Sequence, residues 1–177
     1  MPNSINRITV NRAPVLTLWA AVVAERLGFD WNEALTLGRA VAGLNAFSKG
    51  VALGLFHPKP KEVEEKREKL KHGEELQVNL LHRAVPVIRT EEGLRAVSKG
   101  NPISPESVER YLMGKFGDSY VAARKAMAVL AQSLPPGDLA GSAYQLYEKF
   151  RPEIPPGKKG WGVAGVLDLS RIRSMAR

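Results

Sequence analysis

Residues 27–33 (LGFDWNE) separate two predicted helices and determine how the first part of the chain folds. Before this stretch, apolar residues recur at helical spacing over residues 15–27. Gly28 is expected to end that helix, because glycine is the preferred residue just beyond a helix C-terminus. Asp30 and Glu33 then fit an Asp-x-x-Glu variant of the capping box. In this motif the side chain of each residue accepts a hydrogen bond from the backbone N–H of the other. The pattern predicts a helix, a tight turn and a second helix.

The second predicted helix ends on a sequence that recurs later in the chain. Residues 43–50 (GLNAFSKG) and 93–100 (GLRAVSKG) are identical at six of eight positions. Lysine in the last turn followed by glycine is favourable chemistry for ending a helix, so each copy is interpreted as a structural helix end rather than an anion site. Gly38 and Gly43 would each weaken an isolated helix by about 1 kcal/mol relative to alanine. We expect both to allow close approach of a neighbouring helix.

The remaining elements are predicted to be mostly helical. Residues 61–75 place opposite charges at i,i+4 spacing, which is typical of an exposed helix. Residues 76–89 are compatible with a strand or a buried helix, and we favour a helix to about residue 82 followed by an extended piece. Further helices are expected over residues 90–99, 104–116, 119–134 and 138–150, and from about residue 168 onward. Residues 5–10 suit a lone strand or arm, and residues 151–166 suit a loop or small hairpin.

These elements predict a mainly α fold: a multi-helix globular domain with helix-turn-helix-like corners and at most a small β element. The chain has 177 residues, 44% hydrophobic and 25% charged, which is an ordinary globular balance. We expect a helical core domain over residues 1–150, with a basic, Pro/Gly-rich segment over residues 151–177 packed on the same domain. No stretch approaches the roughly 20 apolar residues that span a bilayer, so no membrane partner is expected and the cytoplasm is the predicted compartment.

The residue types and motifs give little support for catalysis. The chain has no cysteine, which excludes disulfides and thiolate chemistry. Its three histidines share no ligand spacing, so neither a metal nor a cofactor is expected. No nucleophile elbow, zinc-protease motif or dinucleotide-binding glycine pattern occurs. No catalytic residue is assigned, although an enzyme whose pocket is assembled from distant residues stays an open alternative.

The charge of the chain points to polyanionic partners. The net charge is +8, and a strong basic excess favours nucleic acid first. Residues 151–177 hold six basic and two acidic residues, a balance of +4. Within them, Lys158 and Lys159 precede Trp161 between glycines, so the lysines could bind phosphates while the indole stacks on a base. The alternative is that the indole anchors in the core and the lysines are merely solvated.

Two segments have a helix-turn-helix-like arrangement. Residues 22–44 carry acidic side chains where a reading helix needs groups that reach base edges, so an ordinary corner between two helices is the favoured interpretation. Residues 108–130 are the better candidate, with a solvated helical face as the alternative. Four basic residues of this second segment surround its turn: Arg110, Lys115, Arg124 and Lys125.

We therefore predict a non-enzymatic nucleic-acid-binding or accessory protein that contacts phosphates of DNA or RNA through a basic surface. The predicted contact residues are Arg110, Lys115, Arg124, Lys125, Lys158, Lys159 and Trp161. This prediction requires the basic side chains to converge on one surface of the folded molecule. The alternative is a protein-interaction or structural helical module, in its simplest form a homodimer, without a nucleic-acid role.

Overall fold

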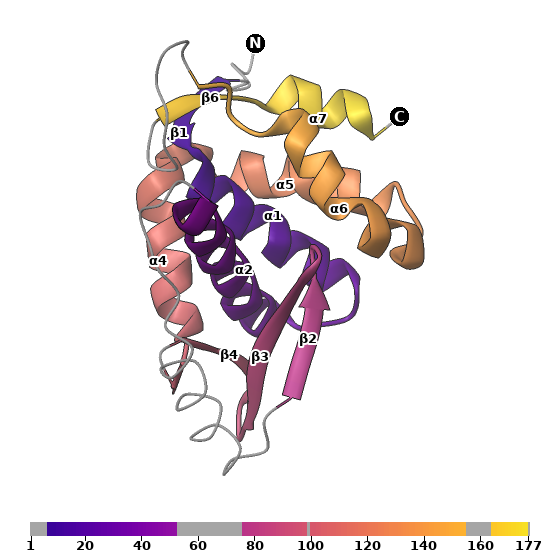
Figure 1. Ribbon diagram of the computed structural model, residues 1–177. Helices are drawn as coiled ribbons and strands as arrows, with labels where there is room; N and C mark the ends of the chain where they lie inside the picture. Colours follow the sequence, from indigo (N-terminus) through magenta and orange to yellow (C-terminus); the bar gives the residue numbers. More distant parts are fainter. Residues whose placement is uncertain (1–6, 53–75, 99, 155–163, 177) are drawn as a thin grey trace.

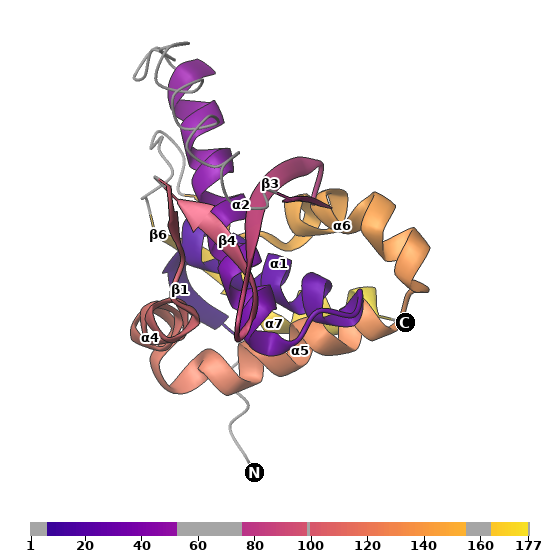
Figure 2. The ribbon, with the colours of Figure 1, turned by 90° about the horizontal axis from the view of Figure 1, so that it is seen from below.

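Helix α1 (Arg12–Arg26) runs through the centre of the molecule, and every residue from Pro14 to Ala24 is buried. A helix that is buried on all sides is a core helix. The computed structural model describes residues 7–52, 76–98, 100–154 and 164–176, and of residues 46–52 it describes only the backbone. Figures 1 and 2 show the other helices arranged around α1, and α2, α4, α5 and α6 all contact it. These helices are α2 (Trp31–Ala52), α4 (Pro105–Phe116), α5 (Tyr120–Gln132), α6 (Pro136–Phe150) and α7 (Leu169–Met175), with a 3-10 turn η1 (Gly117–Ser119) between α4 and α5.

Two antiparallel sheets make this an α/β fold and correct the prediction of a mainly α protein with at most a small β element. The first sheet pairs β1 with β6, and the second has the strand order β2-β3-β4-β5. The strands are β1 (Arg7–Asn11), β2 (Leu76–Leu80), β3 (Arg83–Thr90), β4 (Gly93–Ser98), β5 (Asn101–Pro102) and β6 (Ala164–Asp168). Because β1 and β6 come from opposite ends of the described chain, their pairing brings residues 164–168 onto the start of α1.

The helices predicted over residues 76–82 and 90–99 are wrong, because both stretches lie in the four-stranded sheet. Leu80 of β2 pairs with Arg83 of β3, so Leu81 and His82 form the two-residue turn of a hairpin. Both turn residues have positive φ, 49° for Leu81 and 62° for His82. Such turns normally contain Asn or Gly, so the sequence held no turn signal here. Without that signal, the apolar run was read as a helix.

The repeated sequence adopts two different structures, and neither copy ends a helix. Residues 43–50 lie inside α2, which continues to Ala52, whereas residues 93–98 form β4. Helix propensity is a weak preference that tertiary context overrides. Here the context is a pair of hydrogen bonds from the second copy to α2. The amide of Leu94 donates to Oε2 of Glu33 at 2.8 Å, and the amide of Ala96 donates to Oγ1 of Thr36 at 3.0 Å.

The turn between α1 and α2 is confirmed as a capping box. The Glu33 amide donates to Oδ1 of Asp30 at 2.8 Å, and the Asp30 amide donates to Oε1 of Glu33 at 3.1 Å. One carboxylate oxygen of Glu33 therefore accepts a hydrogen bond at the start of its own helix, and the other accepts one from β4. Gly38 is confirmed as a point of close approach, because a Cβ there would overlap the carbonyl oxygen of Thr17 in α1. Gly43 does not show this role, since no atom of the described residues lies within 4 Å of the equivalent position.

The later helices follow their predicted signals. Ser104 caps α4 by accepting from the amide of Ser107, with Pro105 at the first helical position. Helix α7 begins after Asp168, whose side chain accepts from the amide of Ser170 at 2.9 Å. Helices α5 and α6 lie close to their predicted bounds, although α6 begins at Pro136 and so includes two of the residues expected to break the chain before it. The charged helix predicted over residues 61–75 lies outside the described residues.

Candidate nucleic-acid interface

Arg124, a predicted phosphate contact, lies in a cluster of aromatic and acidic side chains. Its guanidinium stacks over the ring of Trp31, 3.6 Å from the ring centroid, and lies 3.6 Å from a carboxylate oxygen of Glu25. The Trp31 indole N–H donates to Oε2 of Glu109 at 2.9 Å, and the hydroxyl of Tyr120 donates to the same oxygen at 2.9 Å. This arrangement joins α1, α2, α4 and α5. Arg124 is thus paired and stacked within the protein, although 36% of its side chain stays exposed.

The three other predicted contacts on helices are exposed but diverge. Arg110 and Lys115 are five positions apart on α4, which at 3.6 residues per turn sets them about 140° apart around the helix. The Arg110 guanidinium lies 3.4 Å from the hydroxyl of Ser107, and the Lys115 ammonium lies 6.0 Å from the centroid of the Tyr111 ring. Lys125 is on the outer side of α5. Among the described residues, none of the three forms an ion pair, so all remain accessible to an anionic partner.

Lys158, Lys159 and Trp161 lie outside the described residues. The described residues nearest to them in sequence belong to one region of the molecule. Glu153 forms a β-bridge with Val166 of β6, so residues 153 and 166 lie next to one another at the two-stranded sheet. The segment that carries these three predicted contacts therefore leaves and rejoins the described chain at the same end of the molecule.

That end of the molecule also gathers arginines from other parts of the chain. We call Arg7, Arg12, Arg151 and Arg171 together the basic end. Arg7 of β1 and Arg171 of α7 line one pocket of about 280 Å³ together with the carboxylates of Glu153 and Asp168. Arg12, at the start of α1, donates from Nε to the carbonyl of Pro152 at 3.0 Å, next to Arg151. The sequence indicated the basic excess of residues 151–177 but not the part of Arg7 and Arg12. These two arginines are far from that segment in sequence, and only the pairing of β1 with β6 brings them next to it.

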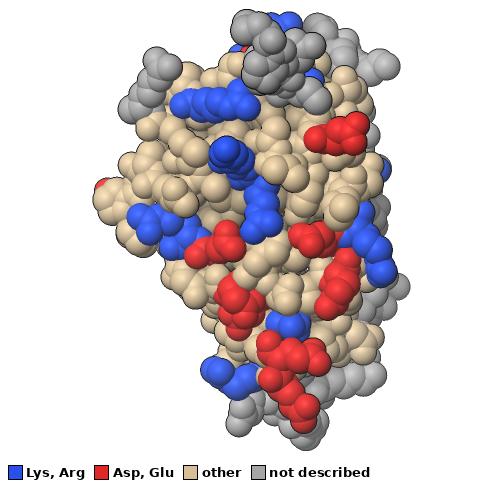
Figure 3. All heavy atoms as spheres, turned by 180° about the vertical axis from the view of Figure 1, so that it is seen from behind, with Lys and Arg blue, Asp and Glu red and all other residues tan. Residues whose placement is uncertain are grey.

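The basic end is only partly neutralised by acidic neighbours. Arg171 pairs with Glu153 at 3.1 Å, but among the described residues Arg7, Arg12 and Arg151 have no ion pair. Burial, and then the nearby charge of Arg151, lower the pKa of Arg12 below its ordinary value. Figure 3 shows basic side chains, together with an acidic one, spaced over the upper part of the rear face, and acidic and basic side chains intermixed over its lower part. The four arginines of the basic end outnumber Glu153 and Asp168 beside them, but the surface is not uniformly positive.

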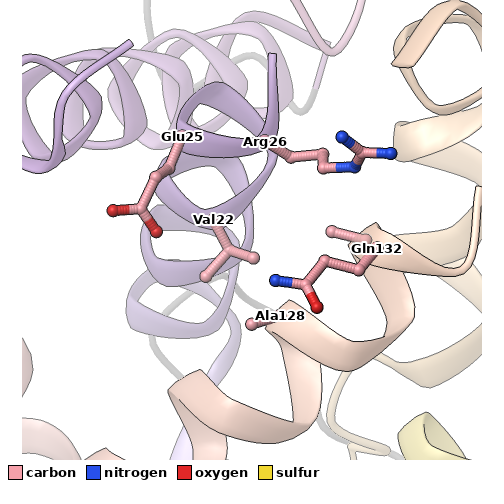
Figure 4. A pocket seen from close by; sticks show the side chains of 6 residues that line it. Val22, Glu25, Arg26, Ala128 and Gln132 are labelled. Atoms are coloured by element: carbon pink, nitrogen blue, oxygen red, sulfur yellow. The ribbon is translucent and has the colours of Figure 1, made fainter. Parts of the chain in front are cut away.

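A second pocket opens between α1 and α5, with a volume of about 520 Å³. This volume falls within the range of small-molecule sites. Its lining residues are Val22, Glu25, Arg26, Ala128, Ala131 and Gln132 (Figure 4). Arg26 donates to the carbonyl of Leu134 at 3.2 Å, and Glu25 pairs with Arg124. The lining thus lacks a paired nucleophile and base, and its arrangement gives no support for catalysis.

The described residues hold no candidate metal centre. Within the described ranges, no three acidic or histidine side chains are grouped so that they could hold an ion. In the same ranges, no helix combines the length and the apolar character that crossing a bilayer requires. Comparison with known proteins gives no match to a family model, a curated protein or a solved structure. The function is therefore inferred from the side chains of this chain.

Tyr147, which lies near the basic end on α6, leads to a prediction for alkaline solution. The side chain is fully buried, and burial raises its pKa above the ordinary value of 10.0. In the unfolded chain the Tyr147 hydroxyl ionises near this ordinary value, whereas in the folded protein it stays protonated to higher pH. The contribution of the protonated hydroxyl to stability is therefore complete below pH 10 and is lost as the pH rises above 10. Between the two pKa values the loss is about 1.4 kcal/mol per pH unit. In urea unfolding, Tyr147→Phe is expected to lose stability less steeply than the wild type over this range; equal slopes would contradict the prediction.

Proposed function

We propose that this protein is a non-enzymatic nucleic-acid-binding protein that contacts phosphates of DNA or RNA through its basic end. The observation that carries the proposal is that Arg7, Arg12 and Arg151 lie around the two-stranded sheet and the end of α6 without an ion-pair partner among the described residues. Arginine presents a planar fork of donors that matches phosphate oxygens. Contacts of this kind supply most of the sequence-independent affinity for nucleic acid.

The proposed surface differs in part from the one predicted by sequence. Arg124 is left out, because Glu25 and Trp31 already occupy its guanidinium. Lys158 and Lys159 are kept, since their segment leaves and rejoins the chain beside the basic end. We retain Trp161 as a proposed stacking residue and the cytoplasm as the proposed compartment. Arg110, Lys115 and Lys125 stay predicted contacts on α4 and α5, away from the basic end, so they provide a matched comparison.

Fluorescence anisotropy with labelled duplex DNA, single-stranded DNA and RNA tests this proposal across a series of salt concentrations. We expect binding at low salt that weakens as salt rises, because phosphate contacts release counterions. The double variant Arg7→Gln/Arg151→Gln should bind more weakly and lower the salt slope by about one unit for each lost contact. The control Arg110→Gln/Lys125→Gln removes the same charge from α4 and α5 and should retain most of the affinity.

Three outcomes would contradict the proposal in different ways. No binding to any of the three nucleic acids at low salt would exclude a nucleic-acid role. Equal weakening by the two double variants would mean that total charge, rather than the basic end, determines affinity. A larger effect of Arg110→Gln/Lys125→Gln would place the interface on α4 and α5, as the sequence predicted.

The alternative of a homodimer is favoured by one specific feature, the outer face of α5. Val121 is 73% exposed and Val129 is 47% exposed, and Ala122 and Ala128 lie on the same helix with part of their surface accessible. This face is apolar except for Lys125, which lies between the two valines, and such a face suits another helix packed against it. Light scattering on the samples used for anisotropy separates the two functions. A salt-insensitive dimer without affinity for polyanions would favour the homodimer over the nucleic-acid-binding protein.

A further inference from the structure

Arg26, the last residue of α1, has a guanidinium with few partners in the protein. Its Nη2 donates to the carbonyl oxygen of Leu134 at 3.2 Å, and among the described residues this is the one hydrogen bond of the side chain. Nε is buried without a partner, and no carboxylate of the described chain pairs with the guanidinium. Buried donors without partners are rare in folded proteins, so this one calls for a specific explanation.

The position of Arg26 between two helix ends explains only part of this arrangement. A cation is favourable in the last turn of α1, and Leu134 lies just beyond the C-terminus of α5. A solvated guanidinium would fulfil that role without enclosing Nε. Instead, the inner part of the side chain is enclosed and its end is held by Leu134. Such a position costs hydration and preorganises the guanidinium, which is typical of a group that is placed for a ligand.

The guanidinium lines the pocket of about 520 Å³ between α1 and α5. Val22, Ala128 and Ala131 give this pocket an apolar wall. Figure 4 shows the side chain of Gln132 reaching from α5 toward Val22, with Arg26 above both. An amide side chain can both donate and accept hydrogen bonds. The pocket therefore combines an apolar wall with a few polar groups, which is the composition of small-molecule sites.

The charges of the lining favour a ligand with a single negative charge. Glu25 is the other charged residue among those that line the pocket, and its carboxylate already lies 3.6 Å from Arg124. In Figure 4 the side chains of Glu25 and Arg26 leave α1 in opposite directions. Arg26 can therefore balance one ligand charge on its own side, whereas a second ligand charge would have no cation there. This balance favours a carboxylate over a phosphate group, which carries close to two charges at neutral pH.

We propose that this pocket binds a small monocarboxylic acid, with its carboxylate against the guanidinium of Arg26. Hydrogen bonds between a guanidinium and a carboxylate are charge-assisted and stronger than neutral ones. The apolar body of the acid covers the valine and the two alanines of the lining, and the amide of Gln132 contacts its polar end. The site lies about 20 Å along α1 from Arg12, so it is separate from the basic end and does not depend on the proposed function.

A titration of the ¹⁵N-labelled protein with benzoate, followed by proton–nitrogen correlation spectra, tests the site. Benzoate is a compact monocarboxylate, and benzamide has nearly the same shape without the charge. We expect benzoate to shift the Nε–H signal of Arg26 and the amides of α1 and α5 around the pocket until the shifts saturate. Benzamide should bind about tenfold or more weakly, because the charge-assisted hydrogen bonds are lost. Inorganic phosphate at equal ionic strength should not saturate these signals.

Three variants locate the benzoate site. Arg26→Gln should bind benzoate about tenfold or more weakly than the wild type, because the cation is removed. Ala128→Leu should lose binding, because the larger side chain fills the pocket while leucine remains a good helix former. Lys125→Gln removes a charge from the outer side of α5 and should bind as the wild type does. Since Ala128→Leu leaves the contacts of Arg26 in place, it tests the site even if Arg26→Gln fails to fold.

Three results would overturn the proposed carboxylate site. The first is a wild type without saturable shifts up to the solubility limit of benzoate. The second is an equal affinity for benzoate and for benzamide or phosphate, because the pocket would then select for apolar shape or for anions in general. The third is wild-type affinity in folded Arg26→Gln or Ala128→Leu, which would place benzoate elsewhere on the protein. Anisotropy measures nucleic-acid binding separately, so either proposal can fail while the other stands.

Discussion

Gly38→Ala is expected to be among the most destabilising single-methyl changes in this protein, with a loss of about 3 kcal/mol. A Cβ on Gly38 would overlap the carbonyl oxygen of Thr17 and lie 3.0 Å from the backbone nitrogen of Ala21. Both atoms belong to the backbone of α1, so no side-chain rotation relieves the contact. The two helices would have to separate, and α1 is the helix against which α2, α4, α5 and α6 pack.

Gly43→Ala is the matched control for this change. It lies five residues further along the same helix, and in the part of the chain that the structure describes no atom is within 4 Å of its Cβ position. Here the substitution is expected to stabilise the protein by about 0.5–1 kcal/mol, because alanine restricts the unfolded chain and favours the helix. The gain in helix propensity is common to both variants, so the difference between them isolates the contact with α1. Urea midpoints followed by circular dichroism measure it, and similar midpoints would show that the helices are less closely packed than described.

Elements whose signals are local were predicted well from the sequence. The capping box of Asp30 and Glu33 and the Ser104-Pro105 start of α4 each involve residues within one turn of each other. The same is true of the cap by Asp168 at the start of α7. Because both partners of such an interaction are close in sequence, their spacing alone reveals it. This accounts for the correct prediction of the helical half of the fold.

The four-stranded sheet was missed because its determinants are not local. Its first hairpin turns at Leu81 and His82, residues that seldom adopt positive φ and so give no warning. Strand β4 pairs with β5 only at Val97 and Ser98, and at its other end its amides donate to side chains of α2. The helix-like ending of residues 93–100 could not reveal partners that lie about 60 residues earlier in the chain.

The candidate interface shows the same limit. The sequence identified Arg124 as a basic residue beside a turn, but the residues that occupy it, Glu25 and Trp31, come from two other helices. Likewise, Arg12 joins Arg151 only because the start of α1 reaches the end of α6. A count of charges along the chain therefore predicts a basic protein, whereas the fold decides which of the charges are available.

Thr36→Val is the second substitution for which we expect a large loss of stability, about 1–3 kcal/mol. Thr36 is fully buried in α2; its hydroxyl donates to the carbonyl of Glu33 at 2.9 Å and accepts from the amide of Ala96 at 3.0 Å. Valine has nearly the same shape, so the packing is preserved while the amide of Ala96 loses its partner. The amide is buried in the protein, and an unsatisfied buried donor is costly.

Thr36→Ser is the control, since it keeps the hydroxyl and removes only a methyl group. It is expected to retain the hydrogen exchange protection of the Ala96 amide, whereas Thr36→Val should lose much of it. Protection of the α2 amides should be similar in both variants, because the change acts on the link to β4 and not on the helix itself. If the Ala96 amide were equally protected in the valine variant, the hydroxyl of Thr36 would have no part in holding β4. Glu33, which accepts from the amide of Leu94, would then be the remaining side-chain link from α2 to this strand.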